Sequence, residues 1–259
     1  MVTLINIILG IVLEIIASLV LLPIRGLTIL IHIFTKRPVG LRKPKNHEGK
    51  GPVILIHGLN MDEICMWYLR WCLKRENWGP LYILHLGPLS WTIEENAHLL
   101  ARSIDPIFQK YGKVHLIAHS MGGLVSRYFI QELNGFSKVG SLITLASPHF
   151  GTPMAHLAWS VCGRQLIPGS AFLAQVNRKP FPQEVPNLFL WSNLDILVPP
   201  RWGGAIGFSP AEGNFSYIGN LGHLMILHSI RVFRVIREFL EKVNQTKMDS
   251  SFMDRAGNL

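Results

Sequence analysis

The sequence predicts an α/β protein with a small, mostly parallel six-stranded sheet, helices on both faces of that sheet and a preceding N-terminal apolar helix. Three observations support this fold class. From Pro52 onward, short apolar runs alternate with longer segments of helical periodicity. The first 34 residues carry only two full charges, Glu14 and Arg25. A serine turn at 118–123 joins an apolar strand segment directly to a helical segment.

Residues 1–37 are predicted to form a membrane anchor. Residues 4–22 are apolar at all but three positions, and 19 residues nearly span the core of a bilayer. A core helix of the folded domain is the alternative interpretation. A cleavable signal peptide is poorly supported, because no Lys or Arg precedes the apolar run. The polar, turn-rich segment 38–51 is predicted to be a basic linker.

Basic residues gather directly after the apolar segment. The formal net charge is +9, and seven of the 25 Lys and Arg residues lie between Arg25 and Lys50. Such a cluster is typical of a segment that faces anionic lipid headgroups, and no nucleic-acid-binding pattern accompanies it. Membrane lipids are therefore expected partners, and nucleic acid is not. Because Lys and Arg beside a span favour the cytoplasmic side, a single N-terminal anchor would leave the folded domain on the cytoplasmic face.

The domain at 52–243 is predicted element by element. A Thr-x-x-Glu capping box at Thr92 and Glu95 marks the start of one helix. The predicted strands are 52–58, 81–86, 113–119, 139–147, 187–192 and 214–219. The predicted helices are 92–111, 121–133 and 224–243, and residues 244–259 are predicted to be a frayed tail.

The most informative motif is Ala-His-Ser-Met-Gly-Gly at 118–123. A small-x-Ser-x-Gly pattern between a strand and a helix predicts a sharp, strained turn that exposes the hydroxyl of Ser120 above the sheet. Ala118 and Gly122 satisfy the need for small residues on either side. The alternative is that Ser120 only caps the helix. The strand before it favours Ser120 as a nucleophile.

A serine nucleophile needs a base and an acid that orients the base. Asp195 follows the fifth predicted strand, and His223 follows the sixth in a glycine-containing loop. A serine turn of this type, called a nucleophile elbow, is followed along the chain first by the acid and then by the His, which is the order found here. Both Asp195 and His223 are expected at the carboxyl edge of the sheet. The rival residues are Glu184 and Glu212 for the acid and His228 for the base.

Two backbone N–H groups are expected to form an oxyanion hole. One is that of Met121, directly after the nucleophile. The other is that of Leu59, in the loop after the first strand of the domain. The nearby His57 precedes the serine and is interpreted as a residue that shapes this loop.

These residues resemble the bacterial lipase and esterase branch of the α/β hydrolases and the related GPI inositol-deacylase-like hydrolases. The matching stretches lie in the correct order between residues 52 and 240: PVILIHGL, HLIAHSMGGLVSRY, LITLASPHFGTP, PGSAFLAQVN, SNLDILVPP and a final LGH. The resemblance implies the α/β-hydrolase fold, a triad of Ser120, Asp195 and His223, and an oxyanion hole at Leu59 and Met121. It also implies a cap segment at 150–186.

The sequence therefore predicts a serine hydrolase that cleaves carboxylic esters of lipid or acyl substrates through an acyl-enzyme. An acyltransferase with the same triad and a catalytically silent, membrane-bound binding module are the alternatives. Neither a metal nor a cofactor is expected. Cys65, Cys72 and Cys162 are interpreted as free thiols, because no spacing among them is typical of a zinc site.

Overall fold

The computed structural model describes residues 39–42, 48–200 and 214–256, together with Ile8, Val12, Ile15 and Ile16. Within these ranges, seven strands form one sheet in the order β1-β3-β2-β4-β5-β6-β7. Their bounds are β1 Gly40–Arg42, β2 Val53–Ile56, β3 Leu81–His85, β4 Val114–His119, β5 Val139–Leu145, β6 Asn187–Trp191 and β7 Phe215–Tyr217. All neighbouring pairs are parallel except β1 with β3.

The sheet differs from the prediction by one strand, because the expected number was six. The additional strand, β1, lies inside the segment 38–51 that was predicted to be a linker, and it pairs antiparallel with β3 through Leu41 and Leu84. A three-residue strand with a glycine and an arginine has no alternating apolar pattern. It becomes a strand because the β3 edge offers it unpaired backbone groups.

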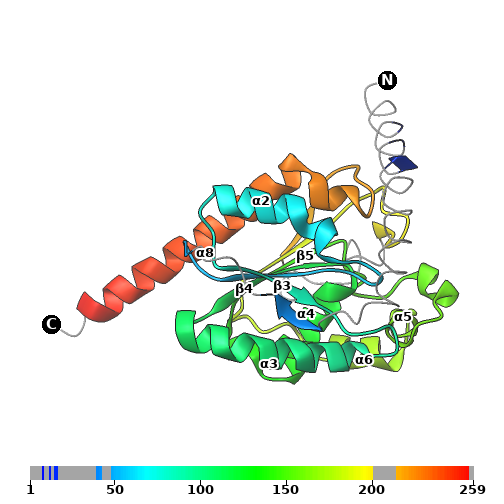
Figure 1. Ribbon diagram of the computed structural model, residues 1–259, viewed down its shortest axis with the longest axis horizontal. Helices are drawn as coiled ribbons and strands as arrows, with labels where there is room; N and C mark the ends of the chain where they lie inside the picture. The colour runs from blue at the N-terminus through cyan, green and yellow to red at the C-terminus, as the bar shows by residue number, and fades with distance from the viewer. Residues whose placement is uncertain are drawn as a thin grey trace.

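Helices cover both faces of the sheet, as the sequence predicts (Figure 1). Helices α3 (Ile93–Tyr111), α4 (Met121–Glu132) and α6 (Ala171–Asn177) lie on one face, and α2 (Trp67–Arg75) and α8 (Ile230–Ala256) lie on the other. Each face has its own apolar core. Every residue of β2 is fully buried, as expected of a central strand with helices above and below it.

Helix α3 begins where its capping box predicts. The Thr92 side chain accepts a hydrogen bond from the backbone N–H of Glu95, and the Glu95 carboxylate accepts one from the N–H of Thr92. Its residues Ile93, Ala97 and Leu100 are buried against the sheet. The helix ends at Tyr111, and its C-cap residue Gly112 has a φ of 77°, which is readily adopted only by glycine.

The C-terminal helix differs from the predicted range 224–243. The structure has a short 3-10 helix, η4 (Met225–His228), then an extended Ser229, and then α8. Helix α8 continues to Ala256, through residues predicted to be a frayed tail, and it projects beyond the body of the domain (Figure 1). No Gly or Pro interrupts the sequence between Ile230 and Ala256, so no strong helix breaker occurs before Gly257.

The remaining short helices lie in the connections between strands. Between β2 and α2 lies η1 (Glu63–Met66), and η2 (Gly135–Ser137) follows α4. The segment between β5 and β6, where a cap was predicted, contains η3 (Pro153–Leu157), α5 (Val161–Arg164) and α6.

The predicted anchor at 1–37 lies almost entirely outside the described residues. Within the part of the chain that is described, no helix combines the length and the hydropathy needed to cross a bilayer.

Candidate active site

Ser120 lies at the junction between β4 and α4, as the elbow motif predicts. Its backbone has φ 54° and ψ −126°, a conformation that a residue with a side chain rarely adopts. The Ser120 N–H donates to the carbonyl oxygen of Leu145 at 2.9 Å, which ties the turn to the neighbouring strand β5. The surrounding sheet therefore holds a strained backbone at the residue proposed as nucleophile.

Glycines around Ser120 allow the close packing that this turn requires. A Cβ atom at Gly122 would lie 2.7 Å from the His57 carbonyl oxygen, and one at Gly123 would lie 2.2 Å from Ser147 Oγ. A Cβ atom at Gly58 would lie 2.8 Å from the Cβ of Ser120. The loop after β2 is therefore pressed directly against the serine.

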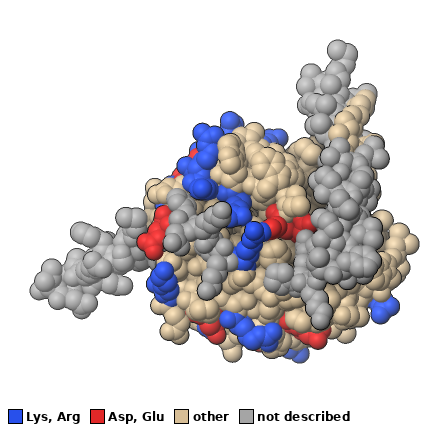
Figure 2. Space-filling view, in the orientation of Figure 1, with Lys and Arg blue, Asp and Glu red and all other residues tan. Residues whose placement is uncertain are grey.

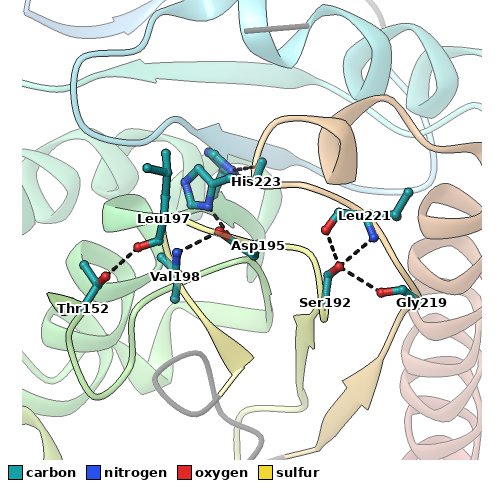
Figure 3. Close-up of polar contacts among 9 residues, drawn as sticks. Thr152, Ser192, Asp195, Leu197, Val198, Gly219, Leu221 and His223 are labelled. Atoms are coloured by element: carbon teal, nitrogen blue, oxygen red, sulfur yellow. Dashed lines mark hydrogen bonds and ion pairs between the residues drawn. The ribbon is translucent and has the colours of Figure 1, made fainter. Parts of the chain in front are cut away.

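Asp195 and His223 form a buried pair (Figure 3). His223 Nδ1 donates to Asp195 Oδ2 at 2.8 Å, and Asp195 Oδ1 accepts from the backbone N–H of Val198 at 2.7 Å. The carboxylate therefore fixes the proton of the imidazole on Nδ1 and leaves Nε2 as the basic nitrogen. The two residues are 28 positions apart and meet because each follows a strand at the carboxyl edge of the sheet.

Two hydroxyl groups hold the loops that carry this pair, and sequence reasoning missed both. Ser192 Oγ donates to the carbonyl oxygen of Gly219 at 2.8 Å and accepts from the N–H of Leu221 at 2.7 Å. Thr152 Oγ1 donates to the carbonyl oxygen of Leu197 at 2.5 Å. Figure 3 shows these contacts on either side of the acid–base pair. The hydroxyl groups donate to backbone carbonyl oxygens, and no residue type in the sequence identifies such an acceptor.

His119 links the end of β4 to the loop of His223. It is fully buried, and its Nε2 donates to the carbonyl oxygen of His223 at 2.9 Å. The centroids of the two rings are 4.6 Å apart. The residue before Ser120 thus contacts His223. Ser120 and His223 are both described by the structure, and no hydrogen bond joins the hydroxyl of Ser120 to the ring of His223.

The rival residues lie elsewhere or outside the described residues. Glu184 is exposed, and Glu212 is not described. His228 contacts the carbonyl oxygen of Leu224 at 3.2 Å, and its ring lies against Trp67, with 6.0 Å between the centroids.

The two expected oxyanion donors belong to two segments that meet at the serine turn. Met121 is the first residue of α4, where backbone N–H groups have no acceptor within the helix and where the positive end of the helix dipole lies. Leu59 directly follows Gly58, the residue that packs against Ser120. The oxyanion hole at these two positions stays a prediction.

A buried polar network lies between α4 and the predicted cap, and the sequence did not predict it. The Arg127 guanidinium contacts His149 Nδ1 at 3.4 Å and donates to Asn177 Oδ1 at 3.0 Å. His149 Nε2 lies 2.9 Å from the hydroxyl oxygen of Thr144. Complete burial, and then the positive charge of Arg127, hold the pKa of His149 well below its ordinary value of 6.5.

Metal-binding chemistry has no candidate in the described ranges. No group of three or more His, Cys, Asp or Glu side chains there could hold a metal ion. All three cysteines are buried, and burial raises the pKa of Cys72 and of Cys162.

Comparison with known proteins agrees with the fold. The family model of the PGAP1-like alpha/beta domain matches residues 90–161, a segment that contains the Ser120 turn but neither Asp195 nor His223. The mature lipase of Bacillus licheniformis has a TM-score of 0.62 at 19% identity, over 80% of this chain and 96% of that one.

Two further solved structures extend this comparison. A monoacylglycerol lipase from Paleococcus ferrophilus has a TM-score of 0.63 at 14% identity, over 81% of this chain and 99% of that one. A thermophilic esterase from Thermogutta terrifontis has a TM-score of 0.55 at 22% identity, over 79% and 93%. The chain therefore has the α/β-hydrolase fold, and its structure is similar to those of lipases and esterases, the proteins that its sequence resembles.

Proposed function

We propose that the protein is a serine hydrolase that cleaves carboxylic esters of lipid or acyl substrates, with Ser120, His223 and Asp195 as its catalytic triad. The observation that carries this proposal is the buried Asp195–His223 pair beside the strained turn of Ser120. A carboxylate bound to Nδ1 of an imidazole, next to a serine at a strand–helix turn, is the arrangement that activates a hydroxyl nucleophile.

The reaction follows from these positions. His223 Nε2 accepts the proton of the Ser120 hydroxyl while Ser120 Oγ forms a bond to the carbonyl carbon of the ester. Asp195 stabilises the resulting imidazolium, and the N–H groups of Leu59 and Met121 bind the oxyanion. Collapse of this intermediate releases the alcohol, which takes the proton from His223, and leaves an acyl-enzyme. Water, deprotonated by His223, then hydrolyses the acyl-enzyme.

The class of substrate is inferred from two features. The similar structures are lipases, among them a monoacylglycerol lipase, and an esterase. In addition, the predicted cap bears the exposed side chains of Leu157 and Trp159. Exposed apolar side chains on the segment beside the site favour an acyl chain over a polar substrate.

Substitution of Ser120 by alanine tests the proposal. A fluorophosphonate probe should label the wild-type protein and leave the S120A variant unlabelled. Hydrolysis of a short p-nitrophenyl ester should fall by a factor of thousands or more. The matched control is Ser126→Ala, which removes a buried hydroxyl from the same helix and should keep both labelling and turnover. More than a tenth of wild-type turnover in S120A would show that Ser120 is not the nucleophile.

A further inference from the structure

Helix α2 presents large apolar side chains to solvent. The exposed fractions are 54% for Trp67, 48% for Trp71 and 46% for Ile64, which precedes the helix in η1. Their spacing of three and four residues places them on one side of the helix. Lys74 and Arg75 continue this side in the last turn, and both are exposed. We call these five residues the α2 face.

The α2 face is ordered and positively charged. The Arg75 guanidinium lies 4.8 Å from the ring centroid of Trp71, and Tyr68 stacks on the same ring at 6.2 Å. Of the acidic residues nearby, Glu63 pairs with Arg42 and Glu76 pairs with Arg237. Asp62 is buried, and its carboxylate accepts a hydrogen bond from the N–H of Ile64. In the space-filling view, Lys and Arg side chains gather beside uncharged surface over the upper helices (Figure 2).

The α2 face begins beside the candidate active site. Its helix follows the loop in which Gly58 packs against Ser120. The Trp67 ring also contacts His228, five residues after His223. A surface bound by the α2 face would therefore lie next to two of the loops that form the site.

From these contacts we infer that the α2 face docks the protein on the surface of an anionic lipid bilayer. Exposed Trp together with Lys and Arg on one helix matches the interface, where indole rings lie at headgroup depth and basic side chains bind anionic lipid. A second copy of the chain fits less well. A two-fold symmetric contact would bury Lys74 and Arg75 of both copies in one interface, where the α2 face offers no acidic residue to pair with them.

Quenching of tryptophan fluorescence tests this docking with the full chain. The probe is vesicles of phosphatidylcholine with about a third phosphatidylglycerol, brominated near the headgroup end of the acyl chains. The vesicles should quench wild-type emission. The variant W67F/W71F should lose at least half of the quenched signal, because bromine quenches only indoles close to it. The control variant W191F removes a tryptophan whose ring centroid lies 4.9 Å from that of Tyr217, and it should leave the quenched signal intact. Unchanged quenching in W67F/W71F would overturn the inference.

A second variant tests the role of charge. In the K74E/R75E variant, the concentration of anionic lipid needed for half-maximal quenching should rise about tenfold. The difference from wild type should shrink at 0.5 M salt, because salt screens the attraction between the protein and the lipid. Equal quenching of this variant and wild type would contradict docking on anionic lipid. Docking on lipid would also be contradicted if sedimentation velocity without lipid showed the wild type to be a dimer and W67F/W71F to be a monomer.

Docking and catalysis can fail separately. Because the inference does not require Ser120 to be a nucleophile, S120A should be quenched like the wild type. Loss of quenching in S120A would contradict a surface built on α2 alone.

Discussion

Each oxygen of the Asp195 carboxylate has a different partner. One oxygen binds His223 Nδ1 and the other binds the N–H of Val198, so the side chain cannot rotate without breaking a buried hydrogen bond. Breaking such a bond leaves a buried polar group unsatisfied, which costs about 1–3 kcal/mol. The loop itself is held by Ser192 and Thr152. The imidazole is thereby held in one orientation before a substrate binds.

Asp195→Asn should therefore leave the protein folded and lower kcat by roughly ten-thousandfold, because an amide cannot stabilise the imidazolium of His223. Steady-state hydrolysis of a p-nitrophenyl ester measures the effect, and circular dichroism checks the fold. The matched control is Glu184→Gln, which changes the exposed rival acid and should be near neutral. If Glu184→Gln were the damaging change, Asp195 would not be the acid.

The residues that sequence could and could not predict differ in the kind of partner they have. Asp195 and His223 were predictable, and the structure pairs them, because parallel strands end at one edge of the sheet and bring their following loops together. His119 and Ser192 instead bind backbone carbonyl oxygens 104 and 27 residues away. A backbone carbonyl is present at every position, so no residue type in the sequence marks those contacts.

The helices and strands that the sequence predicted well are those whose ends or apolar periodicity are clearly marked in the sequence. Helix α3 begins at Ile93 and ends at Tyr111, close to the predicted 92–111, because a capping box and a glycine mark its ends. Strand β1 has no alternating apolar pattern, and its existence depends on the free edge of β3. Helix α8 extends past its predicted end because no strong helix breaker precedes Gly257.

The capping box of α3 gives a prediction at this scale. Thr92→Ala removes the acceptor for the N–H of Glu95 and should lower the free energy of unfolding by about 1 kcal/mol. Urea denaturation measures the change. The control is Glu95→Gln, which keeps a side-chain acceptor for the N–H of Thr92 and should cost less. Equal loss in both variants would show that the Thr92 hydroxyl is not the essential part of the cap.

At the scale of the whole molecule, a buried network joins three layers. Arg127 on α4 contacts His149, which follows β5, and Asn177 at the end of α6. The Asn177 amide also donates to the carbonyl oxygen of His149 at 2.9 Å. Because its members come from the sheet, from the helix that begins after Ser120 and from the predicted cap, the loss of this network should weaken the packing among all three.

The pH dependence of stability follows from His149. Its pKa is lowered well below 6.5 in the folded state, mainly by burial, so the unfolded chain binds the proton more readily. The free energy of unfolding should therefore be unaffected by this group above pH 6.5 and should fall as the pH drops from 6.5 toward the lowered pKa. A single proton contributes a slope of about 1.4 kcal/mol per pH unit.

Urea denaturation at intervals between pH 7 and pH 5 tests this prediction with His149→Gln, whose amide can still bond to Arg127 and Thr144. The variant should be less stable than wild type at pH 7, because the amide fills the ring cavity poorly, but its stability should fall less steeply below pH 6.5. His156→Gln is the matched control, because it makes the same substitution at an exposed histidine. Parallel curves for His149→Gln and wild type would mean that the buried His149 is not the group whose protonation destabilises the folded protein in acid.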